Sequence, residues 1–204
     1  MKITAKFFSL LTVCLTLILS TELSAKSMNE IDAAIESSLT RFTEEIKGGN
    51  AYLQGARGVL VIPRMWKAGV VLGFEFGEGA LIVDDVKVQY YKALTTSLGI
   101  QVGVGSKDLI ILFFDDTAMD NFLYSSGWEV GVDGAVALFP LGAAGAADTN
   151  TFKDAIVGFV FGQKGLIAGV SMEGTKFTKI WPDTGTKMDQ DQEEIETFNE
   201  RLTD

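Results

Sequence analysis

Residues 68–77 read AGVVLGFEFG, so glycine stands at every fourth position of a run that is otherwise mostly apolar. Successive side chains of a β-strand point to opposite faces, and residues four apart therefore share a face. The glycines would lie on one face of a strand, and the larger apolar residues would lie on the other. Repeated glycine on one face predicts a sharp bend or the close approach of another element.

Glycine pairs at 99 and 103 and at 158 and 162 repeat this arrangement farther along the chain. Runs rich in Val, Ile and Phe, separated by Gly and Asp-Gly, predict strands from about residue 58 to residue 180. We expect these strands at 59–62, 68–76, 80–83, 86–98, 100–104, 109–114, 128–132, 135–139, 155–161, 166–172 and 177–180. The predicted fold is α+β and mostly β, a strongly curved antiparallel sheet or partly closed barrel with flanking helices.

Residues 27–47 have the periodicity of an amphipathic helix, and Gly48 and Gly49 end it. Ser27 and Glu30 have the spacing of a capping box, which favours a helix start at this point. One apolar stripe runs along the segment, formed by Ile31, Ile35, Leu39, Phe42 and Ile46. The stripe could pack on the domain or lie on a membrane, and packing is favoured because the polar face is mixed and acidic.

Residues 1–25 have the pattern of a secretory signal peptide, with a basic start, an apolar run over 7–19 and a small residue at Ala25. The apolar run is shorter than the roughly 20 residues that span a bilayer. We therefore expect cleavage after Ala25 and a periplasmic protein. The expected organisation is a domain over 26–182, with a β-rich core at 56–181, and an acidic tail over 183–204.

The composition argues against nucleic-acid binding, against catalysis that needs His or Cys, and against a zinc site. The net charge of −10 becomes −11 once two lysines and one glutamate leave with residues 1–25, and such a surface repels nucleic acid. Histidine is absent from the sequence, and its one cysteine, Cys14, lies in the signal segment. The usual general base, thiol nucleophile and zinc ligands are therefore missing. We predict no catalytic activity, no metal and no cofactor.

The segment 63–67, PRMWK, is the clearest candidate contact site. Two cations, Arg64 and Lys67, surround Trp66 and Met65, a combination that suits a membrane interface or a cation–π contact. Alternatively, Trp66 packs back onto the core. The pattern alone does not decide between these interpretations.

Several short motifs in order resemble the SYLF domain, a lipid-binding family that is also tied to actin regulation in yeast. The motifs are 56–63 (ARGVLVIP), 67–69 (KAG), 77–80 (GEGA), 99–103 (GIQVG), 126–128 (SGW), 131–134 (GVDG), 148–150 (DTN), 157–161 (VGFVF), 164–166 (KGL) and 173–176 (EGTK). The resemblance implies a non-enzymatic domain that binds lipid through an N-terminal amphipathic helix and basic residues. It carries Arg57 and Lys67 over as contacts, whereas the lysine-rich helix start of eukaryotic phosphoinositide binders is missing here.

The sequence thus predicts a non-enzymatic lipid- or membrane-surface-binding module of the bacterial periplasm or envelope. The alternative is a structural or protein-interaction domain of the envelope without a lipid ligand, which the charge of −11 favours. The expected partners are anionic lipid or a membrane surface and an envelope protein, but not nucleic acid. The predicted lipid contacts are Arg57, Arg64, Trp66, Lys67, Ile35, Leu39 and Phe42.

Overall fold

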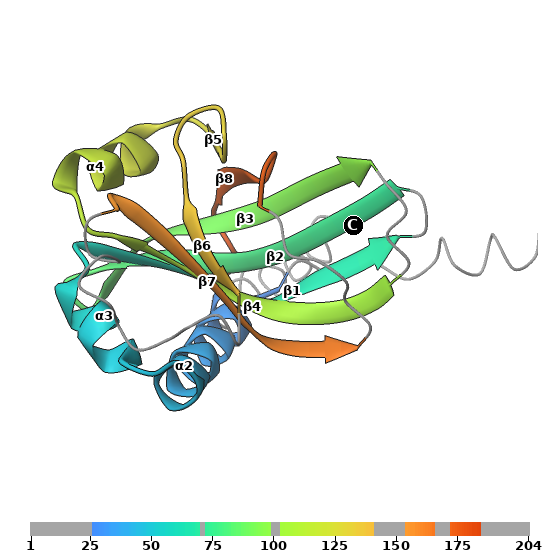
Figure 1. Ribbon diagram of the computed structural model, residues 1–204, viewed down its shortest axis with the longest axis horizontal. Helices are drawn as coiled ribbons and strands as arrows, with labels where there is room; N and C mark the ends of the chain where they lie inside the picture. The colour runs from blue at the N-terminus through green and yellow to red at the C-terminus, as the bar shows by residue number, and fades with distance from the viewer. Residues whose placement is uncertain (1–25, 70–71, 99–102, 141–153, 166–171, 185–204) are drawn as a thin grey trace, which may run out of the picture.

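The computed structural model describes residues 26–69, 72–98, 103–140, 154–165 and 172–184 (Figure 1). Its elements are α2 (Met28–Glu45), α3 (Gly49–Gly55), β1 (Gly58–Gly69), β2 (Leu72–Val83), β3 (Val86–Leu98), β4 (Gly103–Phe113), α4 (Asp116–Tyr124), β5 (Trp128–Glu129), β6 (Ala137–Pro140), β7 (Ile156–Gly165) and β8 (Lys176–Ile180). The strands form one sheet in the order β5-β8-β3-β2-β1-β4-β7-β6. Neighbouring strands are antiparallel except β6 and β7, which are parallel.

The sheet curls into a half-barrel, which confirms the predicted curved, mostly β fold. Side chains from both edges of the sheet meet on its inner face, where Trp128 of β5 and Phe177 of β8 share an apolar core with Leu138 of β6. Helix α4 closes this core through Phe122. A second core lies on the outer face, under α2 and α3.

Helix α2 confirms the predicted amphipathic helix to within two residues at each end. Both hydrogen bonds of the capping box are present, from Glu30 N–H to the Ser27 side chain and from Ser27 N–H to the Glu30 carboxylate. Ile31, Ile35 and Phe42 are buried against the sheet, so the apolar stripe packs on the domain in this structure. The sequence did not predict α3, which begins directly after Gly48 in the left-handed conformation.

The glycines on β2 allow β1 to approach closely, as the sequence predicted. A Cβ at Gly77 would lie 2.5 Å from Ile62 Cγ2, and one at Gly79 would overlap the carbonyl oxygen of Val61. Both contacts are too short for any side chain. The approach coincides with a bulge in β1, where the pairing with β2 shifts between Val61 and Trp66 and Arg64 has a φ of 49°.

Two predictions about strand boundaries were wrong. The segment 63–67 is not a loop, because β1 continues through it to Gly69. The predicted strand 68–76 is divided between the end of β1 and the start of β2. Most of the predicted strand 166–172 lies outside the described residues, whereas β3 has the predicted bounds of Val86 and Leu98.

Candidate functional site

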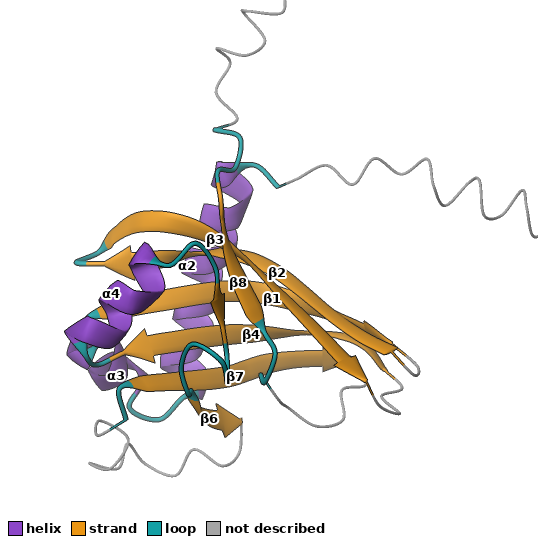
Figure 2. Ribbon diagram, turned by 90° about the horizontal axis from the view of Figure 1, so that it is seen from above, coloured by secondary structure: helices purple, strands orange, loops and turns teal. Residues whose placement is uncertain are grey.

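An apolar surface lies on the outer face of the sheet, on the strand ends that extend past α2 (Figure 2). We call it the outer apolar face, and it consists of Trp66, Phe74, Phe76, Leu94 and Val104, all exposed. Trp66 pairs with Phe76, and Phe76 pairs with Leu94, so these side chains form one row across three strands. Single exposed apolar residues are ordinary, but a contiguous group marks an interaction site.

The contacts of α2 explain why this face is open. The helix crosses the sheet obliquely, and its N-terminal part is held by the hydrogen bond from Tyr90 Oη to Asp32 Oδ1 at 2.8 Å. Farther along, Arg41 Nε donates to Asp108 Oδ2 at 2.8 Å. The strands continue beyond these anchor points without a helix above them. We call the part under α2 the covered half of the sheet and the part beyond it the open half.

Lysines lie at both ends of the apolar row. Lys176 of β8 pairs with Leu94, and Lys164 of β7 pairs with Ser106, which in turn pairs with Trp66. Directly paired residues in antiparallel strands share a face, and both lysines are exposed. The row therefore reads Lys, Leu, Phe, Trp, Ser, Lys, and beyond Lys176 it continues to Glu129 of β5. The apolar centre lies between two cations, one of which is paired with a carboxylate.

The inner face of the open half has the opposite character. Lys67 Nζ lies 3.1 Å from Glu75 Oε1, and Lys107 Nζ lies 2.6 Å from Glu75 Oε2. The three side chains are between 1% and 7% exposed. We call them the inner charged cluster. Beside it, the hydroxyls of Thr95 and Thr175 lie 2.7 Å apart and are buried as well.

Asp108 marks the boundary between the two halves. Its carboxylate accepts hydrogen bonds from the Arg41 guanidinium and from the backbone N–H of Arg64 at 2.8 Å. The side chain is 3% exposed, and a Cβ at Gly162 would lie 2.8 Å from its Oδ2. One carboxylate thus joins α2 to the sheet and holds the bulged backbone at Arg64.

The structure separates the residues that the sequence grouped as lipid contacts. Trp66 is 60% exposed and Arg64 is also exposed, in keeping with a contact on the outer face. Lys67 lies on the inner face and is buried, because it alternates with Trp66 along β1. The expectation that Lys67 stands beside Trp66 at a surface is therefore wrong for this conformation.

The remaining expected contacts lie elsewhere. Arg57 is exposed near α4, with its Nε 3.5 Å from Asp116 Oδ1 and away from the open half. Ile35 and Phe42 are buried between α2 and the sheet, and Leu39 is half-buried in the same core. They are not available to lipid while α2 is packed.

Four members of the outer apolar face were not predicted from the sequence. Alternation placed Phe74 and Phe76 opposite the glycines of residues 68–77, but it did not show whether that apolar face is buried or exposed. Leu94 and Val104 each alternate with a polar residue or glycine on their strands. An exposed apolar face and a buried one have the same period, so the period alone could not distinguish them.

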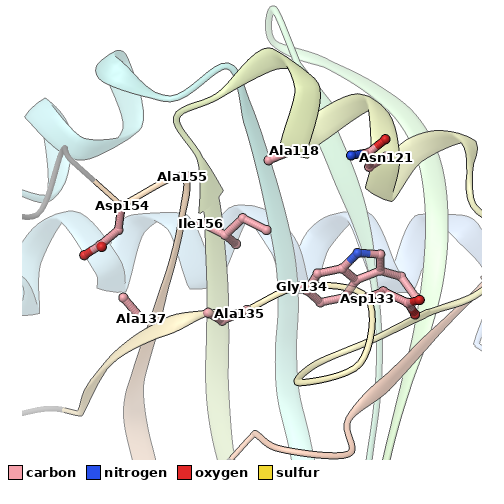
Figure 3. A pocket seen from close by; sticks show the side chains of 11 residues that line it. Ala118, Asn121, Asp133, Gly134, Ala135, Ala137, Asp154, Ala155 and Ile156 are labelled. Carbon is pink, nitrogen blue, oxygen red and sulfur yellow. The ribbon is translucent and has the colours of Figure 1, made fainter.

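A separate pocket of about 520 Å³ lies between α4, the segment before β6 and the start of β7 (Figure 3). Its walls are mostly small or apolar side chains, and Trp128 packs closely against Gly134. The charged residues that line it, Asp133 and Asp154, are both acidic. This pocket therefore does not suit an anionic ligand. The described residues also contain no group of three or more acidic, His or Cys side chains placed to hold a metal.

A curled, mostly β half-barrel with an exposed apolar face defines the protein as a member of the class of β-rich binding modules. Residues 94–182 match the family described as Ysc84, Las17-binding protein actin regulator. This match confirms, over residues 94–182, the resemblance to the SYLF domain seen in the sequence. The family is a non-enzymatic binding domain. No curated protein matches the chain.

Proposed function

We propose that the protein is a non-enzymatic module that binds anionic lipid at a membrane surface of the bacterial periplasm. The observation that carries this proposal is the outer apolar face with lysines at both ends of its central row. The signal-peptide pattern of residues 1–25 supports the location. Within the described residues, no helix has the length and apolarity needed to cross a membrane.

The chemistry of this face matches the interfacial region of a bilayer. Trp prefers the level of the lipid headgroups, and the transfer of Phe and Leu side chains from water to the acyl region lowers the free energy. Lys164, Lys176 and Arg64 would remain at headgroup level, where each cation near an anionic surface contributes about 1 kcal/mol. The sheet face would therefore rest on the membrane with its apolar row inserted and its cations at the sides.

A net charge of −10 would repel anionic lipid, but the charge close to the contact face is what matters. Screening in physiological salt confines electrostatic effects to a Debye length of roughly 8 Å. The cations of the open half would be closer to the headgroups than the acidic body of the protein is. Binding should thus require anionic lipid and weaken as the salt concentration rises.

This mode of binding differs from the one that the sequence suggested. Helix α2 need not leave the sheet, because the apolar surface is already exposed on the strands. Opening the helix would also expose the core around Phe42, whose ring centroid lies 5.2 Å from that of Phe159. The open half offers contact without that cost.

Flotation with vesicles tests the proposal. The protein without residues 1–25 should float with phosphatidylcholine vesicles containing phosphatidylglycerol, and much less with phosphatidylcholine alone. The double variant Trp66→Ala, Phe76→Ala should lose at least tenfold in binding, since two large side chains account for about 3–5 kcal/mol of apolar transfer before ordering costs. The double variant Lys164→Gln, Lys176→Gln should bind less and respond less to salt.

Matched controls lie elsewhere on the surface. Trp181 is more exposed than Trp66, so Trp181→Ala controls for the loss of one exposed indole. Lys47→Gln removes an exposed lysine that lies just after α2 and outside the row. Equal flotation of the face variants and the controls would exclude the outer apolar face as the contact. Failure of every form to float with any lipid would favour an envelope protein as the partner.

A further inference from the structure

The inner charged cluster has more positive than negative charge. Two ammonium groups, of Lys67 and Lys107, share the single carboxylate of Glu75, and the three side chains carry a net charge of +1. Lys107 is 1% exposed, and in the described part of the chain neither its Nζ nor the Glu75 Oε2 that lies 2.6 Å from it makes a hydrogen bond of good geometry. A buried lysine has three N–H donors to satisfy, and one carboxylate cannot satisfy both ammonium groups.

Burying two ammonium groups beside one carboxylate costs free energy unless a further anion is bound. Moving an ion out of water costs several kcal/mol, and the attraction within an ion pair offsets this only when its geometry is good and the remaining donors find acceptors. An apolar side chain at position 107 would avoid the cost, and β4 already places Leu109 and Ile111 on the same inner face. A bound ligand therefore explains the charge at Lys107 better than a contribution to stability does.

Among the described residues, glycines stand beside the cluster on the inner face of the sheet. Gly69 lies two residues after Lys67 on β1, and it pairs with Gly73 of β2 and with Gly103 of β4. These glycines share the inner face with Lys67 and Glu75 because side-chain direction alternates along each strand. The next residue in the row of Lys67 is also glycine, Gly105. A strand rises about 3.3 Å per residue, so the cluster lies only about 7 Å from the end of β1.

We propose that the inner face of the open half binds an anionic group of phosphate or carboxylate chemistry between Lys67 and Lys107. One anion would neutralise the cluster and accept the N–H donors that Glu75 leaves unsatisfied. Glu75 would hold the two ammonium groups apart and in place. The glycine row would leave room for the rest of the ligand toward the strand ends. This site is separate from the outer apolar face and does not depend on vesicle binding.

The sign of the charge change makes the proposal testable. Removing a lysine leaves a balanced Lys-Glu pair, so Lys107→Met should weaken anion binding without a large loss of stability in the absence of the anion. Removing the carboxylate leaves two like charges, so Glu75→Gln should lower the melting temperature and increase the rise that an anion produces. If the cluster were only structural, both variants would lower the melting temperature and the anion would affect neither.

Thermal unfolding of the full chain, followed by tryptophan fluorescence, provides the measurement. Inorganic phosphate is titrated against sodium chloride at equal ionic strength. Phosphate should raise the melting temperature in proportion to ln(1 + [L]/Kd), by about 5–10 °C at a 100-fold excess over Kd. Lys107→Met should lose most of this rise, whereas Lys47→Gln, which removes an exposed lysine just after α2, should keep it.

A second arm distinguishes a free anion from a lipid headgroup. Dodecyl phosphate below its micelle concentration carries the same charged group with an acyl-like chain. If it produces the same shift at a concentration at least tenfold lower than inorganic phosphate, the ligand is an amphiphile; equal shifts at equal concentrations indicate a small free anion. The proposal is overturned if phosphate and dodecyl phosphate both match chloride, or if Lys107→Met keeps the full rise. Wild type and Lys107→Met decide the matter even if Glu75→Gln does not fold.

Discussion

The covered and open halves of the sheet use the same alternating strands for opposite purposes. In the covered half, both faces are apolar and buried, with Val61 under α2 and Leu60 in the inner core. In the open half, the outer face exposes Trp66 and Phe76 while the inner face buries the Lys67–Glu75 ion pair. The open half is therefore apolar on the outside and charged on the inside, the reverse of a water-soluble sheet.

This reversal shows that stability and function are separated along the strands. A single strand, β2, contributes Leu81 to the inner core and Phe76 to the exposed face. Substitutions in the covered half should change the free energy of unfolding. Substitutions on the outer face of the open half should change binding and leave the fold nearly unchanged. The predictions below test this separation.

The largest contrast should come from two phenylalanines. Phe42 is fully buried and packs against Phe159 and Phe161, with ring centroids 5.2 and 5.4 Å away. Phe42→Ala should lower the free energy of unfolding by about 3–5 kcal/mol, because it leaves a cavity between α2 and the sheet. Phe76 is 41% exposed, and Phe76→Ala should cost less than about 1 kcal/mol.

Chemical denaturation of both variants measures this contrast, with vesicle flotation on the same samples. Phe76→Ala should reduce flotation while its unfolding midpoint stays close to that of the wild type. A large loss of stability in Phe76→Ala would mean that the open half is packed against something in solution. That result would remove the separation between the two halves.

The boundary between the halves should show an effect of intermediate size. Asp108→Ala removes the acceptor for both the Arg41 guanidinium and the Arg64 N–H, and it should cost about 2–4 kcal/mol. The exposed pair of Arg57 and Asp116 is the matched control, since Asp116→Ala should cost less than about 0.5 kcal/mol. Similar losses in both variants, measured by urea unfolding, would show that Asp108 does not couple α2 to the sheet.

Local signals explain what the sequence could predict. The stripe from Ile31 to Ile46 and the Ser27–Glu30 capping box lie within one helix, so their spacing was sufficient to locate α2. The curvature followed from glycines such as Gly77, because close approach of a strand leaves no room for a Cβ. Both features depend on residues near each other in sequence.

The candidate site depended on information that periodicity does not contain. The sequence grouped Trp66 with Lys67, although alternation would place them on opposite faces of one strand; alternation also could not show that the larger residue faces solvent and the charged one faces inward. That outcome depends on where α2 ends on the sheet, and Asp108 and Tyr90 set this through contacts across many residues. The continuation of β1 through residues 63–67 was also missed.

The smallest expected effect concerns two neighbouring tyrosines on opposite faces of β3 in the covered half. Burial raises the pKa of Tyr90 to about 12, and its hydrogen bond to Asp32 adds to the rise. Asp32 also forms an ion pair, in which its Oδ2 lies 3.0 Å from Lys87 Nζ. Burial also raises the pKa of Tyr91, whose Oη has no hydrogen-bond partner among the described residues. The two hydroxyls therefore differ in what they contribute at neutral pH.

Tyr90→Phe should cost about 1 kcal/mol at pH 9, since it removes a hydrogen bond, whereas Tyr91→Phe should be neutral or slightly stabilising, since it removes an unsatisfied hydroxyl. A pKa that folding raises gives stability that is fully present below the unfolded value near 10 and is lost as the pH rises through the folded value. The advantage of the wild type over Tyr90→Phe should thus shrink between pH 10 and pH 12. Urea unfolding at pH 9 and pH 11 measures this change. A difference between wild type and Tyr90→Phe that stays constant across that range would show that the Tyr90–Asp32 contact does not hold α2 on the sheet.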